Sequence, residues 1–132
     1  MIYIETSVVL AQLLAEDRCP PESLWADSLV SSRLTEYEVW NLIHARGLGS
    51  SHGEAVRLLL GRLRWLEMTP IALARALEPW PVHLRTLDAL HLASVEFLRV
   101  HGQDVKLASY DGRLIGHLPG PPDRQRSAHI PS

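Results

Sequence analysis

The stretch Leu84–Arg99 restricts the fold more than any other part of this sequence. It has the length of a helix, and its residues are mostly apolar, so only a narrow face can meet water. One carboxylate, Asp88, lies near its start, on the side of the helix that also carries Leu92 and Val95. A charged Asp among apolar residues is costly unless a cation or hydrogen-bond donors meet it. The stretch therefore predicts a largely buried helix whose acid is either a first-turn residue, which helix starts favour, or a functional group.

Length and composition limit the class of protein. A chain of 132 residues predicts one domain, which we place at residues 1–117, followed by an irregular or poorly ordered, proline-rich tail at residues 118–132. The 13 Lys and Arg nearly balance the 15 Asp and Glu, so no global positive field indicates nucleic acid. A single cysteine, Cys19, excludes a disulfide framework and a cysteine-based metal site. The sequence shows neither a signal peptide nor a membrane span, so a cytoplasmic location is expected.

Short apolar runs alternate with longer amphipathic segments, a pattern typical of βαβ units. Strands are expected at Met1–Ile4, Leu29–Ser32, Glu67–Ile71 and Val105–Ser109. Helices are expected at Val8–Glu16, Glu22–Asp27, Leu34–Arg46, Ser50 or Ser51 to about Trp65, Ala72–Glu78, Leu84–Arg99 and from Asp111 through His117. We expect Thr6 or Ser7 to cap the first helix. The tail shows no convincing strand, so a further strand is expected to be missing or irregular.

Four acids take related places in this pattern. Glu5 and Asp111 follow the first and last expected strands, whereas Glu38 and Asp88 project from apolar helix faces. Because parallel strands end at one edge of a sheet, the four carboxylates would meet there and repel one another. Mg²⁺ and Mn²⁺ prefer oxygen ligands and remove that repulsion, and such ions assist phosphodiester hydrolysis. From spacing alone, a helix-edge acid paired with an arginine remains open for Glu38, and a helix cap for Asp111.

Four motifs resemble those of PIN-domain ribonucleases, and more narrowly the VapC-type toxins of bacterial toxin–antitoxin pairs. They are YIETS at Tyr3–Ser7, SSRLTEYE at Ser31–Glu38, LRTLDALHLAS at Leu84–Ser94 and LASYDGRL at Leu107–Leu114. The third motif is the most specific, and the resemblance spans Met1 to about Leu114. It implies an α/β fold, a three-layer α/β/α PIN-like sandwich on a central, mostly parallel sheet of four to five strands.

The resemblance also implies a metal-dependent endoribonuclease toxin that cuts tRNA or rRNA with Mg²⁺ or Mn²⁺. The catalytic acids carried over by position are Glu5, Glu38, Asp88 and Asp111, with Glu5, Asp88 and Asp111 as metal ligands. Supporting hydroxyls would be Thr6 and Ser109, and the nearest candidates for gripping RNA are Arg85 and Arg113. The implied partner is a VapB-like antitoxin that pushes a basic side chain into the acidic pocket. The implied assembly is a homodimer or a toxin–antitoxin hetero-oligomer.

Position 5 departs from the family pattern, which normally has Asp there. The extra methylene of Glu5 moves the carboxylate by about 1.5 Å, one carbon–carbon bond, and Mg²⁺ demands near-ideal geometry. The site either works normally, works poorly or with a more permissive ion such as Mn²⁺, or is attenuated. The alternative function is therefore a catalytically weakened or inactive PIN scaffold that only binds its partner.

Two other classes fit less well. A phosphoacceptor receiver domain needs a lysine at the end of a late strand, but Lys106 comes too early in its strand, and two adjacent acids after the first strand are absent. A nucleophilic hydrolase has no support, because Cys19 precedes two prolines with no nearby histidine and no G-x-S-x-G motif occurs. His91, three residues after Asp88, is a conceivable general base, but we expect a structural or interface role.

Overall fold

A computed structural model describes residues 1–15, 18–81, 83–112, 114 and 127–129. At its centre is a parallel sheet of five strands in the order β3-β2-β1-β4-β5. The strands are β1 (Ile2–Ile4), β2 (Leu29–Ser32), β3 (Arg64–Leu66), β4 (Lys106–Ser109) and β5 (Ser127–His129). The helices are α1 (Thr6–Leu14), the short 3₁₀ helix η1 (Glu22–Ala26), α2 (Arg33–Ala45), α3 (Gly49–Leu60), α4 (Pro70–Ala76) and α5 (Thr86–Val100).

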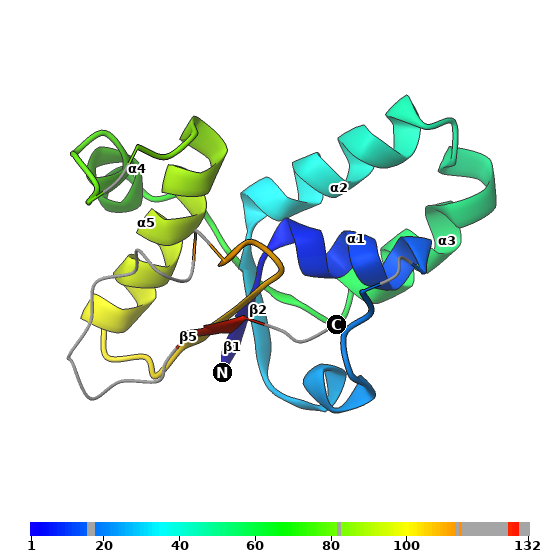
Figure 1. Ribbon diagram of the computed structural model, residues 1–132, viewed down its shortest axis with the longest axis horizontal. Helices are drawn as coiled ribbons and strands as arrows, with labels where there is room; N and C mark the ends of the chain where they lie inside the picture. The colour runs from blue at the N-terminus through cyan, green and yellow to red at the C-terminus, as the bar shows by residue number, and fades with distance from the viewer. Residues whose placement is uncertain (16–17, 82, 113, 115–126, 130–132) are drawn as a thin grey trace.

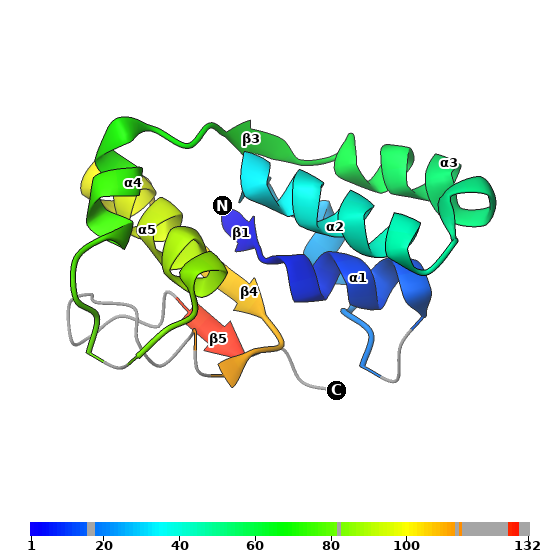
Figure 2. The same ribbon diagram turned by 90° about the horizontal axis from the view of Figure 1, so that it is seen from above.

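The helices form two layers around the sheet. Helices α1, α2 and α3 cover one face, and α4 and α5 cover the other (Figures 1 and 2). Alternation along the strands separates two cores, because neighbouring side chains of a strand point to opposite faces. Ile4 and Leu29 pack with α1 to α3, whereas Tyr3 and Val30 pack with α5. The predicted three-layer α/β/α architecture is confirmed.

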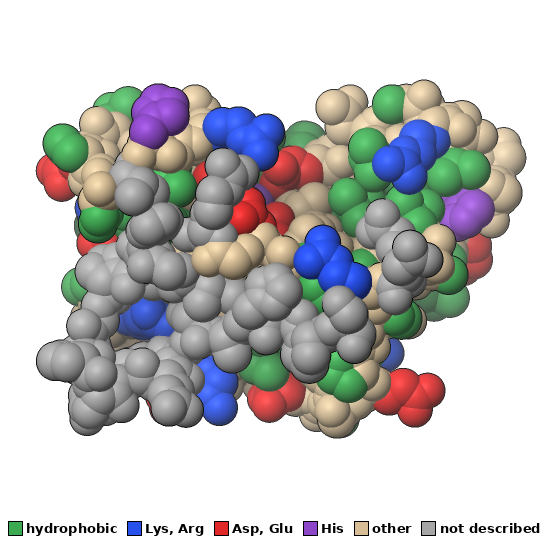
Figure 3. Space-filling view, viewed as in Figure 1, with side chains coloured by type: hydrophobic (Ala, Val, Ile, Leu, Met, Phe, Trp, Pro, Cys, Tyr) green, Lys and Arg blue, Asp and Glu red, His purple; other side chains and the backbone are tan. Residues whose placement is uncertain are grey.

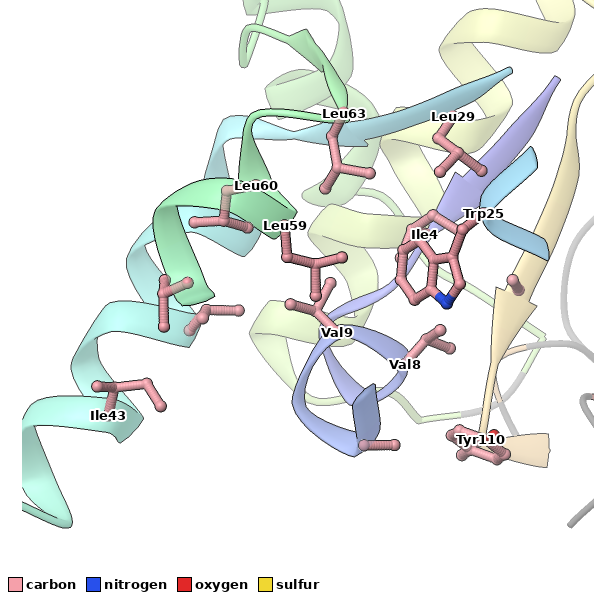
Figure 4. Packing of buried hydrophobic residues seen from close by; sticks show 14 residues of the cluster. Ile4, Val8, Val9, Trp25, Leu29, Ile43, Leu59, Leu60, Leu63 and Tyr110 are labelled. Atoms are coloured by element: carbon pink, nitrogen blue, oxygen red, sulfur yellow. The ribbon is translucent and has the colours of Figure 1, made fainter. Parts of the chain in front are cut away.

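The larger core lies under α1, α2 and α3 (Figure 4). Val8 and Val9 of α1, Ile43 of α2 and Trp25 belong to the same buried cluster. The smaller core packs Leu92 and other buried residues of α5 against the opposite face of the sheet. In the described part of the chain, no helix is long and apolar enough to cross a membrane.

Strand β1 lies in the middle and aligns the ends of its neighbours. Ile2 pairs with Leu29 of β2 and with Lys106 of β4. All three strands run in the same direction, so they end at the same edge of the sheet. Glu5, which follows β1, and Asp111, which follows β4 by two residues, therefore lie at that edge, as predicted.

Three expectations about the elements are wrong. The third strand is Arg64–Leu66 rather than Glu67–Ile71, because α3 already ends before Gly61 and the next residues pair with β2. Pro70 is the first residue of α4, where its missing N–H costs nothing, and the Thr69 side chain caps this helix. The tail does contain a strand, since Ser127–His129 pairs with β4.

Other boundaries differ less. The helix expected at Glu22–Asp27 is a 3₁₀ helix over Glu22–Ala26. After Asp111, Gly112 and Leu114 have helical conformation, and the rest of the helix expected through His117 lies outside the described residues.

Candidate active site

Glu5 occupies the turn between β1 and α1 and caps the helix itself. Its Oε2 accepts a hydrogen bond from the backbone N–H of Ser7 at 3.1 Å, and its Oε1 accepts one from the Ser7 hydroxyl. The cap expected at Thr6 or Ser7 is therefore supplied by Glu5, whose longer side chain can fold back onto the first turn. The residue is only 8% exposed. A carboxylate so deeply placed needs several donors, and these contacts supply them.

Ser109, at the end of β4, joins the two strand-end acids. Its hydroxyl donates to Glu5 Oε1 at 2.8 Å and accepts from the backbone N–H of Asp111 at 2.9 Å. Ser7 makes a second link, because its hydroxyl accepts from the N–H of Tyr110 at 3.1 Å. Glu5 and the Asp111 backbone are thus fixed on either side of one serine, which confirms that the structure brings these two positions together.

Glu38 projects from α2 into a second network that adjoins the first. Its Oε1 accepts from the Thr6 hydroxyl at 2.7 Å and lies 2.6 Å from His91 Nε2. The other imidazole nitrogen, Nδ1, is 2.7 Å from the hydroxyl of Tyr3. Because Thr6 directly follows Glu5, these contacts place Glu38 beside the β1 end of the site. Oε2 of Glu38 has no hydrogen-bond partner among the described residues.

The contact between His91 and Glu38 is electrostatic as well as steric. Burial opposes the charged form of His91, which is 1% exposed, but interactions with Tyr3, Glu38 and Glu5 outweigh burial and raise the pKa of His91 to about 10. Burial likewise raises the pKa of Glu38, but the hydrogen bond and charge of His91 and the Thr6 hydroxyl overcome it and lower that pKa. The two side chains therefore form an imidazolium–carboxylate pair at neutral pH.

Asp88 lies in the first turn of α5, on the side of the helix that faces Glu38. His91 is three residues further along and contacts Glu38, and residues three apart share a helix face. The Asp88 side chain is 21% exposed, and its Oδ2 lies 3.8 Å from Nε of Arg85, whose side chain is 77% exposed. Such an exposed, long ion pair contributes little to stability, and the Asp88 side chain is partly accessible to solvent.

Acidic side chains gather in a hollow between the two helical layers. Figure 3 shows Asp and Glu side chains in the hollow between α5 and α2, with Lys or Arg side chains at its edges. Oxygen donors dominate this site, which suits Mg²⁺ or Mn²⁺ in kind. No group of three or more His, Cys, Asp or Glu side chains is close enough to hold a metal among the described residues. Since Mg²⁺ often takes only one or two carboxylates and completes its shell with water, the donor set still fits such an ion.

The sequence identified the acids and two of their supporting hydroxyls, Thr6 and Ser109, which contact Glu38 and Glu5. It did not single out Tyr3, it gave Ser7 only as a possible helix cap, and the structural role expected for His91 is extended by its contact with Glu38. The spacing of His91 and Asp88 in LDALHLA was the available signal, because it puts both on one helix face. Arg113, proposed to grip RNA, lies outside the described residues.

Comparison with known proteins identifies the family. A profile of the PIN domain matches residues 2–115. Ribonuclease VapC35 of Mycobacterium tuberculosis is 30% identical over 119 residues, covering 86% of this chain and 87% of the relative. The chain therefore belongs to the PIN domain family, as its motifs indicated, and resembles VapC ribonucleases within it.

Solved structures agree on the fold. A toxin–antitoxin complex from Klebsiella pneumoniae matches with a TM-score of 0.64 at 15% identity, over 97% of this chain and 96% of the other. The crystal structure of VapC20 of M. tuberculosis, a toxin that cleaves the sarcin–ricin loop, matches with a TM-score of 0.64 at 19% identity, over 86% and 92%.

Proposed function

We propose that this chain is an endoribonuclease toxin of the VapC type that hydrolyses RNA phosphodiester bonds with Mg²⁺ or Mn²⁺. The observation that carries the proposal is that the Ser109 hydroxyl holds both the Glu5 carboxylate and the backbone N–H of Asp111, beside a Glu38 that is fixed through Thr6. Glu5 and Asp111, which are far apart in the sequence, share one edge of the sheet. The similarity to VapC ribonucleases supports the hydrolysis of RNA.

Each acid has a role in this proposal. Glu5, Asp88 and Asp111 would hold a divalent ion, which would supply Lewis-acid activation of water and offset the charge of the scissile phosphate. Glu38 keeps Oε1 on Thr6 and His91, so its Oε2 would orient the attacking water. The hydroxyls of Thr6 and Ser109 orient the carboxylates. Arg85, beside Asp88, would contact the RNA backbone, as would Arg113.

A second candidate, a weakened or inactive scaffold, rests on the same glutamate. Three donors, two from Ser7 and one from Ser109, already occupy the Glu5 carboxylate. A carboxylate offers about four acceptor positions, so direct metal ligation by Glu5 competes with these hydrogen bonds.

The proposal includes an antitoxin partner. One structural neighbour is a toxin–antitoxin complex, and a site lined by acids would accept a basic side chain from such a partner. We further propose a cytoplasmic protein that forms a homodimer or a hetero-oligomer with its antitoxin.

RNA cleavage by the protein with Mg²⁺ and Mn²⁺, beside Glu5→Asp and Asp88→Asn, tests the proposal. Cleavage by the parent protein that Asp88→Asn abolishes supports the enzyme. Cleavage only by Glu5→Asp supports the weakened scaffold. If none of the three cleaves tRNA or rRNA, titration calorimetry with Mn²⁺ follows, and absence of binding would refute the metal site.

A further inference from the structure

A hollow of about 380 Å³ adjoins the acidic site on the side of α1 and α2. Ser7 belongs to both, because it lines the hollow and its hydroxyl donates to Glu5. The remaining lining residues are Leu10, Ala11, Leu14, Arg18, Leu42, Arg46 and Tyr110. The hollow is therefore one residue away from the carboxylate at the centre of the site.

Two arginines give this hollow its chemistry. Nη1 of Arg18 donates to the carbonyl oxygen of Tyr110 at 3.3 Å, and its guanidinium lies 4.7 Å from the centre of the Tyr110 ring. These contacts hold Arg18 beside the strand end that carries Asp111. Arg46, exposed, follows the last residue of α2.

The charges of these two arginines are not neutralised by acids in the part of the chain that the structure describes. Four other arginines do pair with carboxylates: Arg33, Arg57, Arg75 and Arg85. The chain as a whole carries a formal charge of −2. An RNA backbone is thus repelled by the acids and by the average charge, and needs local cations to stay on the surface.

We propose that the hollow is a phosphate subsite, in which Arg18 and Arg46 bind an RNA backbone phosphate next to the one that is cut. This inference rests on the proposed function. Guanidinium groups bind phosphate oxygens bidentately. The position of the hollow beside the acids favours RNA over an acidic protein segment. An RNA strand whose scissile phosphate lies at the acids would carry its next phosphates past Ser7, which lines the hollow. Arg85 lies on the other side of the acids, beside Asp88, so cations border the strand path on both sides.

Salt-dependent RNA binding tests this subsite. In an Asp88→Asn background, which prevents cleavage, the affinity for a fluorescein-labelled single-stranded RNA of mixed sequence is measured between about 50 and 200 mM salt. Arg18→Ala and Arg46→Ala should each flatten the slope of log K against log salt by about 0.7, and together by about 1.4. Arg46→Lys keeps the charge and should keep the slope. With Asp88 restored, the alanine variants should raise KM for RNA cleavage and leave kcat nearly unchanged.

Arg64→Ala is the matched control, because Arg64 is exposed and is the first residue of β3. Strand β3 is the outermost strand on the side of the sheet away from β4 and Tyr110. Unfolding midpoints of all variants verify that they are folded. Slopes of the two alanine variants equal to that of Arg64→Ala would overturn the subsite. Loss of binding to polyglutamate with unchanged RNA binding would also overturn it, by assigning the hollow to protein carboxylates. If the parent protein neither binds nor cuts RNA, the proposed function itself fails. If the parent protein does so and the variants match it, only the subsite fails.

Discussion

The buried pair of His91 and Glu38 should make the stability of this protein fall as pH rises above neutrality. The pKa of His91 is about 10 in the folded state, against 6.5 as its ordinary value. A group whose pKa is raised by folding contributes its full stabilisation of the folded state at pH values below its unfolded pKa. It loses that contribution as the pH rises to its folded pKa. Each pH unit in this window corresponds to about 1.4 kcal/mol, so the whole window is worth about 5 kcal/mol. Glu38 acts in the opposite sense, because folding lowers its pKa. Its contribution to stability is therefore present at pH values above its unfolded pKa and is lost in acid.

Urea unfolding at a series of pH values between about 6 and 10, in the protein and in His91→Gln, measures this contribution. The difference in unfolding free energy between the two isolates His91 from the other titrating groups. We expect that difference to shrink steadily across the window. Tyr3→Phe is the matched control, because it keeps both partners but removes the hydroxyl that contacts Nδ1, and it should give a smaller dependence.

Parallel free-energy curves for the protein and His91→Gln would refute the charged pair. A second readout does not depend on the variant being folded. The NMR titration of the His91 ring in the unaltered protein should show no midpoint near 6.5, and a midpoint there would also contradict the reasoning.

Three further predictions follow from single contacts. Ser109→Ala removes a donor from the buried Glu5 carboxylate, so RNA cleavage should fall roughly tenfold to a hundredfold, measured as kcat/KM. Leu92→Ala creates a cavity at a fully buried position and should lower the unfolding free energy by about 2–5 kcal/mol. Thr69→Ala removes the side-chain cap of α4 and should lower the unfolding free energy by about 1 kcal/mol. Urea unfolding measures both losses. A larger loss for Thr69→Ala than for Leu92→Ala would contradict the packing described.

The sequence predicted those parts of the fold in which pattern and tertiary environment agree. The apolar runs gave β1, β2 and β4, and the helical periodicity gave α2 and α5, because each buries the face that its pattern marks. Strand β3 was missed because it has three residues and follows α3 closely. Strand β5 was missed because Ser127–His129 has no strand-like alternation of apolar residues, and only pairing with β4 defines it.

The site was predictable to the level of its acids and of two supporting hydroxyls, Thr6 and Ser109. Glu5 and Asp111 follow strands, so topology alone brings them to one edge. The cap that Glu5 forms on its own helix depends on side-chain length and rotamer, which spacing does not reveal. The contact between His91 and Glu38 joins α5 to α2 across the sheet, and no local pattern encodes a contact between residues so far apart in sequence.

The central position of β1 has a consequence for how the protein is made. Its first partner, β2, is synthesised early, but its other partner begins only at Lys106, and Glu5 finds Ser109 only after that strand is complete. A growing chain on the ribosome therefore carries its first acid long before the last one exists. Non-local parallel pairing is slow to form, so the site assembles only after β4 has been made and has paired with β1.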